Sequence, residues 1–285
     1  MSSTGSQQAT GESPLLLFPY YYSKRIRARI INTNSLPNVI STEKPGEQPS
    51  LALDNVHLSV TAGEKIALCG RTGSGKSSML ALLLKLLDPT AETSANILID
   101  NVPLRLVDRN TLRLRLIAMP QDAVFLPDGS TFQQNLDPFA VADAEECQAA
   151  LQSVGLWPAI EERGGLVGSM KSDTLSQGQR QLFSLARVIL RRRIRGRNGG
   201  SEGGILLLDE VTSSVDQETE KTIQTIIGAE FRDYTILAVS HRLQFIMDYD
   251  RVVVMDKGKI VEVGNPRELA EGETRFGDLW RAAER

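Results

Sequence analysis

The sequence predicts an α/β fold built round a mostly parallel sheet, and three observations support this prediction. Short, mostly apolar runs at 66–69, 205–208, 235–239 and 252–255 are typical of strands buried within a sheet. Apolar residues with helical spacing follow Ser176. Of the 285 residues, 41% are hydrophobic and 24% are charged, which is ordinary for a globular domain.

Composition also narrows the class of protein. The formal net charge is −3, which gives no indication of a nucleic-acid partner. The two cysteines, Cys69 and Cys147, lack metal-ligand spacing and indicate a reduced, cytosolic compartment. No apolar run approaches the roughly 20 residues that a membrane-spanning helix needs. If the protein works at a membrane, other segments or other chains must supply the anchor.

Two parts of different composition follow one another along the chain. Residues 1–50 are rich in Ser, Thr, Gly, Pro and Gln and lack sustained periodicity, as in a flexible tail or linker. Their aromatic and basic patch, Tyr20 to Arg29, is compatible with a lipid surface or with a solvated linker. Residues 51–285 have the periodicity of one folded domain.

Within this domain, strands near both ends flank a helical stretch at about 122–185. The alternating segment 56–60 predicts a half-buried strand. The apolar segment 79–87 predicts a buried helix that ends at Asp88-Pro89. After the helical stretch, an Arg- and Gly-rich segment at about 191–204 predicts an exposed basic loop, for which a solvated surface is favoured over a partner site.

Turn and cap signals mark several boundaries. Lys257-Gly258-Lys259 turns the strand at 252–255 into a second strand at 260–263, forming a hairpin. Asn265 and Pro266 open a closing helix as its cap and first residue. Two pairs have the pattern of a capping box: Asp143 with Glu146, and Ser176 with Gln179.

The strongest chemical pattern matches G-x-x-x-x-G-K-[ST], which predicts a phosphate-binding loop and a P-loop NTPase fold. A buried strand precedes the match and an apolar helix follows it, so the glycines can wrap phosphates at a helix N-terminus. Lys76 is expected to bridge the β- and γ-phosphates of ATP, and Ser77 to hold Mg²⁺. The alternative is a glycine-rich turn without a ligand. The residues expected at the nucleotide are Gly70, Arg71, Thr72, Gly73, Ser74, Gly75, Lys76, Ser77 and Ser78.

A second pattern is the apolar strand 205–208, which ends in two carboxylates. In doubly wound sheets, ligands bind at the carboxyl ends of the strands. Asp209 can therefore orient Mg²⁺, usually through water, and Glu210 can polarise an attacking water. The pattern is weak alone and strong beside a P-loop.

A third set of motifs carries a family resemblance. Leu175-Ser176-Gln177-Gly178-Gln179 resembles the signature motif of ABC ATPases. Gln121 resembles the Q-loop glutamine, Ser213–Asp216 the D-loop and His241 the switch histidine, in the family's order. The resemblance covers about residues 51–280.

This resemblance implies a RecA-like core, a small antiparallel β subdomain and an inserted helical subdomain with the signature motif. It also implies that two nucleotide-binding domains, from the same or different chains, close face to face on two ATP molecules. The implied catalytic residues are Lys76, Glu210, His241 and Gln121, and the implied Mg²⁺ ligands are Ser77, Gln121 and Asp209. The residues implied to contact the ATP of the partner domain are Ser176, Gly178 and Gln179.

Three shorter sequence segments are similar to the second nucleotide-binding domain of the C subfamily, the multidrug-resistance-associated group. The similarity is greatest to fungal members. The similar segments are Gly70–Gly73, Asn135–Phe139 and Leu175–Leu182. This similarity implies ATPase-coupled transport, transmembrane domains as partners, and a place at the cytoplasmic face of the plasma or vacuolar membrane. The first domain of that subfamily commonly lacks the catalytic glutamate, whereas Glu210 is present here.

One family feature is missing, the early aromatic residue that stacks on adenine, since Pro45–Ser50 contains none. His57 is expected to be an exposed structural residue.

Two other functions stay open: a soluble ABC ATPase not involved in transport, and a truncated ATP-binding module with little hydrolysis. The absence of sustained heptads disfavours the first. The second is disfavoured because the residues needed for hydrolysis are present: Lys76, Asp209, Glu210 and His241.

Overall fold

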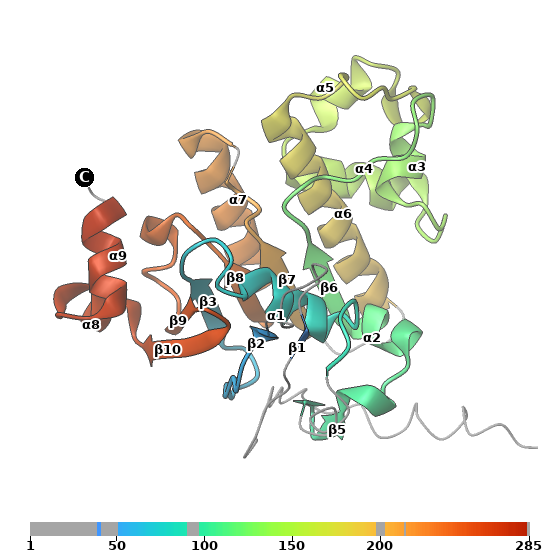
Figure 1. The fold of residues 1–285 in the computed structure, drawn as a ribbon. Helices are drawn as coiled ribbons and strands as arrows, with labels where there is room; N and C mark the ends of the chain where they lie inside the picture. Colours follow the sequence, from blue (N-terminus) through green and yellow to red (C-terminus); the bar gives the residue numbers. More distant parts are fainter. Residues whose placement is uncertain (1–38, 41–50, 90–96, 198–202, 214, 284–285) are drawn as a thin grey trace, which may run out of the picture.

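The computed structural model describes residues 39–40, 51–89, 97–197, 203–213 and 215–283. Its centre is a six-stranded sheet with the strand order β10-β9-β3-β8-β7-β6 (Figure 1). Within this sheet β10 pairs antiparallel with β9, and the other pairs are parallel, which confirms the predicted fold class. The strands are β3 (Lys65–Cys69), β6 (Leu116–Met119), β7 (Ile205–Asp209), β8 (Thr235–Val239), β9 (Arg251–Asp256) and β10 (Lys259–Gly264).

Different helices cover the two faces of this sheet, because successive strand residues point to opposite faces. The helices beside it are α1 (Lys76–Leu83), α2 (Arg109–Arg115), α6 (Gln177–Arg197), α7 (Gln217–Glu230), α8 (Pro266–Glu271) and α9 (Arg275–Ala283). On one face, Ile66 and Leu68 share a core with α1. On the other, Leu206 and Leu208 share a core with α6 and α7, and Val252 packs with α8 and α9.

A helical part stands apart from the sheet, and α6 joins the two (Figure 1). Its further helices are α3 (Phe132–Leu136), α4 (Ala144–Ser153) and α5 (Trp157–Glu161). Phe132 and Phe183 pack in its core, with ring centroids 6.3 Å apart. The predicted capping box at the start of α4 is confirmed, because Asp143 accepts from the Glu146 amide at 2.8 Å and Glu146 accepts from the Asp143 amide at 3.0 Å.

The prediction of a basic loop at 191–204 is wrong for residues 191–197, because they form the last turns of α6. The guanidinium groups there have acceptors on other elements. Arg193 pairs with Glu230 of α7 at 2.9 Å, and Arg197 pairs with Glu146 of α4 at 2.7 Å. These contacts hold the arginines against the fold, so the charge run stays helical.

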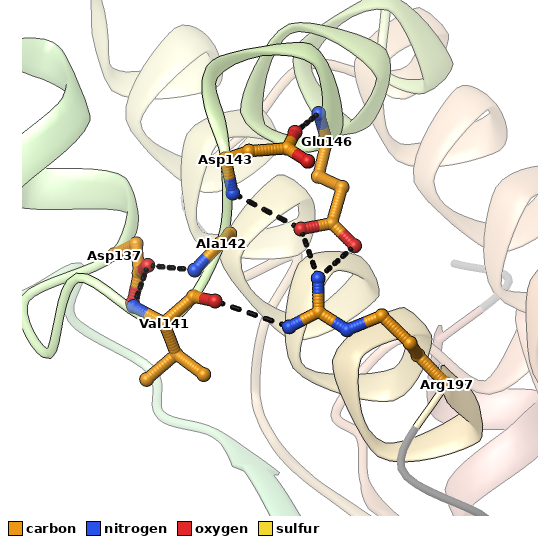
Figure 2. A network of polar contacts seen from close by, with 6 residues as sticks. All are labelled: Asp137, Val141, Ala142, Asp143, Glu146 and Arg197. Atoms are coloured by element: carbon orange, nitrogen blue, oxygen red, sulfur yellow. Dashed lines mark hydrogen bonds and ion pairs between the residues drawn. The ribbon is translucent and has the colours of Figure 1, made fainter.

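Figure 2 shows how the end of α6 also fixes the segment before α4. The carboxylate of Asp137 accepts from the amides of Val141 and Ala142, both at 2.6 Å. Arg197 in turn donates to the carbonyl of Val141 at 3.1 Å. The last turn of α6 and the start of α4 therefore form one polar cluster.

Two small antiparallel pairs accompany the main sheet: β1 (Val39–Ile40) with β2 (Leu51–Leu53), and β4 (Leu98–Ile99) with β5 (Val102–Pro103). The predicted strand at 56–60 is corrected. Val56, Leu58 and Val60 are buried between exposed neighbours, but the segment forms no ladder with a strand of the described residues. Its alternation reflects packing of an extended segment.

The predicted helix at 79–87 is shifted, because α1 begins at Lys76 and ends at Leu83. Gly75, with φ 101°, precedes its first turn, and Lys85, with φ 54°, lies in the turn after it. Left-handed backbone at Lys85 cannot continue a right-handed helix, so the chain turns before Asp88-Pro89.

Two other boundary predictions are confirmed. The hairpin joins β9 to β10 through Lys257 and Gly258, both with positive φ. Asn265 caps α8 by accepting from the amides of Arg267 and Glu268, and Pro266 is the first residue of the helix.

Some sequence predictions fall outside the described residues: the Tyr20–Arg29 patch, the Pro45–Ser50 stretch and residues 198–202. Among the described residues, no helix is long and apolar enough to span a membrane. Three short 3₁₀ helices complete the described structure: Leu104–Leu106, Gly165–Val167 and Leu243–Phe245.

We predict that Glu64→Gln lowers the free energy of unfolding by about 1–3 kcal/mol at pH 7. Glu64 pairs with Arg251; burial raises the pKa of Glu64, but hydrogen bonds from Arg251 and Thr61 outweigh burial and hold it below the ordinary value. A lowered folded-state pKa stabilises the protein above the unfolded pKa, and this contribution is lost as the pH falls. Urea unfolding of both proteins at pH 7, 5 and 3.5 should show the difference shrinking at the lowest pH. A difference that does not change with pH would contradict this account.

Candidate functional site

Parallel strands bring four of the predicted motifs to one edge of the sheet. The segments that follow β3, β8, β7 and β6 begin at the carboxyl ends of adjacent strands. They carry, in that order, the Gly70–Ser77 loop, His241, Glu210 and Gln121, and Asp209 is the last residue of β7. This edge is where ligands bind in doubly wound sheets.

Backbone geometry explains the glycines of the loop between β3 and α1. Gly70 has φ 138°, and a Cβ atom there would overlap the carbonyl oxygen of Met255. Gly75 has φ 101°, and a Cβ atom there would lie 2.6 Å from the carbonyl oxygen of Ala52. Only glycine fits such positions, so the tight path of the loop depends on both residues.

Lys76, the first residue of α1, is 5% exposed. Its ammonium donates to the carbonyls of Gly70 and Arg71 at 2.9 and 3.2 Å, so the loop curls round it. Burial lowers the pKa of Lys76, and the nearby Glu210 carboxylate offsets part of this effect. Both hydrogen bonds of this ammonium among the described residues go to neutral carbonyls. A buried cation with only neutral carbonyl partners is suited to an anionic ligand.

The first turn of α1 fits the same kind of ligand. Gly75 offers no side-chain cap, and the turn contains no acidic residue. Its amides and the positive end of the helix therefore favour an anion. Ser74 is buried, and its hydroxyl has no hydrogen-bond partner among the described residues.

Ser77 and Asp209 meet across the site. The Ser77 hydroxyl donates to Asp209 Oδ1 at 3.0 Å, joining the start of α1 to the end of β7. Burial raises the pKa of Asp209, and the hydrogen bond from Ser77 opposes that rise. A hydroxyl and a carboxylate oxygen at this separation are a fitting pair of ligands for Mg²⁺.

Glu210 and His241 form the third contact of the site. His241 Nε2 lies 2.7 Å from Glu210 Oε1, so the segments after β7 and β8 are joined by their side chains. Glu210 has φ 48°, a left-handed conformation that costs a non-glycine residue on the order of 1–3 kcal/mol. Its amide still donates to the Val239 carbonyl at 3.1 Å, which holds this backbone in place.

The signature residues do not join this cluster. Ser176 and Gln179 form the predicted capping box, with contacts of 3.1 and 3.3 Å, at the start of α6. Figure 1 shows this end of α6 in the helical part, away from α1. Gly178 packs instead on α7, where an added Cβ atom would lie 3.3 Å from the Thr219 hydroxyl.

Gln121 lies at the same sheet edge with an exposed side chain. Its backbone carbonyl accepts from the Gln181 side chain at 2.6 Å, which ties the segment after β6 to α6. His57 is exposed, as predicted, and its ring contacts the Asn55 side chain at 3.0 Å.

Sequence reasoning missed a buried ion pair beside the site. Arg242 follows His241 directly and pairs with Glu220 of α7, which is 0% exposed. Glu220 stands in phase with Ile223 and Ile227, both buried on the same helix. A carboxylate at that helical spacing indicates a buried charge that needs a partner, and this signal could have identified the pair.

The parallel sheet, the loop round Lys76 and the carboxylates after β7 define a P-loop ATPase domain. A family model described as ABC transporter matches residues 53–213. The chain belongs to the ABC transporter family and forms its nucleotide-binding, ATP-hydrolysing type of domain.

Fungal relatives are similar over most of this chain. The ABC-type transporter braE of Annulohypoxylon truncatum is 61% identical over 88% of the chain, and the ABC transporter FGM5 of Gibberella zeae is 54% identical over 84%. The chain spans only 17% and 16% of their respective lengths. A bacterial Atm1-family ABC exporter with ATP bound shares 25% identity and a TM-score of 0.75, with coverage of 94% of this chain and 44% of that one.

We predict that Gly70→Ala destabilises the chain by about 2–4 kcal/mol, because the new methyl group must displace the Met255 carbonyl. Gly73→Ala is the matched control, since Gly73 has φ 80° but nothing within 4 Å of an added Cβ atom. It should cost only about 1–2 kcal/mol. Urea unfolding without nucleotide measures both. Equal losses would show that the close approach to Met255 is not what requires glycine.

Proposed function

We propose that this chain is the ATP-hydrolysing motor of a membrane transporter and works as one half of a nucleotide-sandwich dimer. The observation that carries the proposal is the convergence of three matched contacts at one sheet edge. They are the loop round Lys76, the Ser77–Asp209 hydrogen bond and the Glu210–His241 contact. Each supplies a different part of phosphoryl transfer: anion binding, metal binding and activation of water.

The residues from Gly70 to Ser78 would bind the phosphates of ATP, with Lys76 at the β- and γ-phosphates. Ser77 and Asp209 would hold Mg²⁺, with Gln121 as a further ligand from the segment after β6. The described residues contain no cluster of three acidic, His or Cys side chains able to hold a metal, so water and phosphate oxygens would complete the ligand set. Bound Mg²⁺ would neutralise negative charge on the phosphates.

Glu210 would polarise the attacking water, because its carboxylate stands at the end of β7 beside Lys76 and Asp209. His241 would hold that carboxylate in position through the 2.7 Å contact and face the γ-phosphate. Gln121 would complete the catalytic group. The left-handed backbone of Glu210 supports this role, because strained backbone conformations occur most often at active sites, where a side chain must be held in one orientation.

Ser176, Gly178 and Gln179 would serve the ATP held by a second nucleotide-binding domain, of the same or another chain. The end of α6 that lies in the helical part is away from α1 in Figure 1, which supports this, because the two ends would then meet one nucleotide only when it is held between two domains. The start of the 21-residue α6 offers its amides and positive end to a γ-phosphate.

Resemblance to the second cassette of the C subfamily and the names of the relatives support a role in transport. The ABC multidrug transporter B of Aspergillus fumigatus is 38% identical over 83% of this chain, which spans 15% of its length. We propose transmembrane domains as partners, no nucleic acid, and a site of action at the cytoplasmic face of the plasma or vacuolar membrane.

Lys76→Ala should weaken MgATP binding at least about tenfold, because one charge-assisted contact is worth roughly 1.5–3 kcal/mol. Titration with a fluorescent ATP analogue measures the dissociation constant. Lys221→Ala, which removes an exposed lysine of α7, is the charge-matched control and should bind as the unmodified chain does. An unchanged constant in Lys76→Ala would exclude the phosphate role.

Glu210→Gln should bind ATP but accumulate as an ATP-bound dimer, because the amide keeps the shape of the carboxylate and is a far poorer base. Light scattering with MgATP should show a larger species than the unmodified chain forms. Turnover of the unmodified chain should rise with protein concentration, since assembly is second order. Fast turnover by monomeric Glu210→Gln would refute the shared-site mechanism.

A further inference from the structure

Arg242 joins two segments of the site that no strand pairing connects. Its Nη2 donates to the carbonyl of Val215 at 2.9 Å, and its Nη1 pairs with Glu220 of α7. Its own backbone amide is fixed by the Ser240 hydroxyl at 3.1 Å. The residue next to His241 is therefore anchored to the segment between β7 and α7.

Burial makes this anchor strong. The Glu220 side chain is 0% exposed, and one of its oxygens, Oε1, has no hydrogen-bond partner among the described residues. A buried carboxylate with so few donors depends on its one cation, because an unpaired charge is costly there. Arg242 is thus held in place, while its second N–H group remains for Val215.

The contact continues to the start of α6. Asp216, next to Val215, caps α7 by accepting from the amides of Glu218 and Thr219 at 3.0 and 2.9 Å. Its other oxygen accepts from the Thr219 hydroxyl at 2.7 Å. Gly178 lies beside this same Thr219 side chain, since a Cβ atom added at Gly178 would be 3.3 Å from the Thr219 hydroxyl. A continuous series of contacts and chain neighbours therefore leads from Arg242 through Val215, Asp216 and Thr219 to the first turn of α6.

A pocket that is partly open to solvent lies beside this contact. It has a volume of about 390 Å³ and lies between the two segments and α9, lined by Val215, Asp216, Arg242 and Trp280 among others.

We propose that Arg242 is a positioning residue that, through Glu220 and Val215, fixes the first turn of α6 relative to His241. The inference rests on the proposed function, in which His241 serves this chain's ATP and Ser176 serves the partner's. The Arg242–Glu220 pair would then connect the two ATP sites within one chain. A contiguous contact path is its physical basis, and local exchange kinetics can test it.

The experiment is hydrogen exchange on the full 285-residue chain, unmodified and as Glu220→Gln. Amide exchange at Gln179 and Arg180 should become about fivefold faster in Glu220→Gln, the change expected from weakening one hydrogen bond. Glu64→Gln is the matched control, because it breaks another partly buried Arg–Glu pair far along the sequence. It should leave Gln179 and Arg180 unchanged.

Arg242→Lys serves if Glu220→Gln does not fold. It keeps the charge beside Glu220 but replaces two diverging N–H groups with one ammonium, so the Val215 contact should be lost and the same amides should exchange faster. Unchanged exchange in the folded variants, or equal acceleration in Glu64→Gln, overturns the proposal.

A fluorescent ATP analogue titrated into the same samples separates the proposed function from the proposed role of Arg242. Failure of the unmodified chain to bind it counts against the proposed function, whereas normal binding with unchanged exchange refutes only the link.

Discussion

Parallel hydrogen bonding of β3, β8, β7 and β6 is the constraint on which the rest of the site depends. Parallel strands end at a common edge, so segments far apart in sequence meet there without any direct tendency to associate. Ser77 and Asp209 are 132 positions apart, yet they share a hydrogen bond of 3.0 Å. The crossover helices α1, α6 and α7 make this possible, because each buries an apolar face against the sheet.

Buried charges then determine which contacts hold the loops at that edge. Lys76 donates its hydrogen bonds to neutral carbonyls, with Glu210 nearby but not in contact as an ion pair, whereas Glu220 is directly paired with Arg242. The charge of Lys76 has no direct counter-ion, so it can attract an anion. The charge of Glu220 is already balanced by Arg242. Of the two buried ionic groups near this sheet edge, Glu220 is thus paired within the chain, and we propose that Lys76 serves to bind an anion.

Sequence predicted best where a pattern is determined by local burial or capping. The strand at 235–239 matches β8 residue for residue, because a segment buried on both faces is mostly apolar, as the four residues after Thr235 are. Asp143 with Glu146 marked a true helix start, since both partners lie within one turn. Residues 191–197 were misjudged because the acceptors of their guanidinium groups, Glu230 and Glu146, come from distant elements. The contact between Arg242 and Glu220 was missed for the same reason.

The length of α6 has a mechanical consequence. A helix of 21 residues is about 32 Å long at 1.5 Å per residue, and this one joins the helical part to the sheet without a break. It therefore behaves as a lever whose base lies beside β6. A tilt of about 5° at the base would displace the far end by roughly 3 Å, which is the length of a hydrogen bond. Small angular changes near the sheet can thus form or break contacts at the first turn of α6.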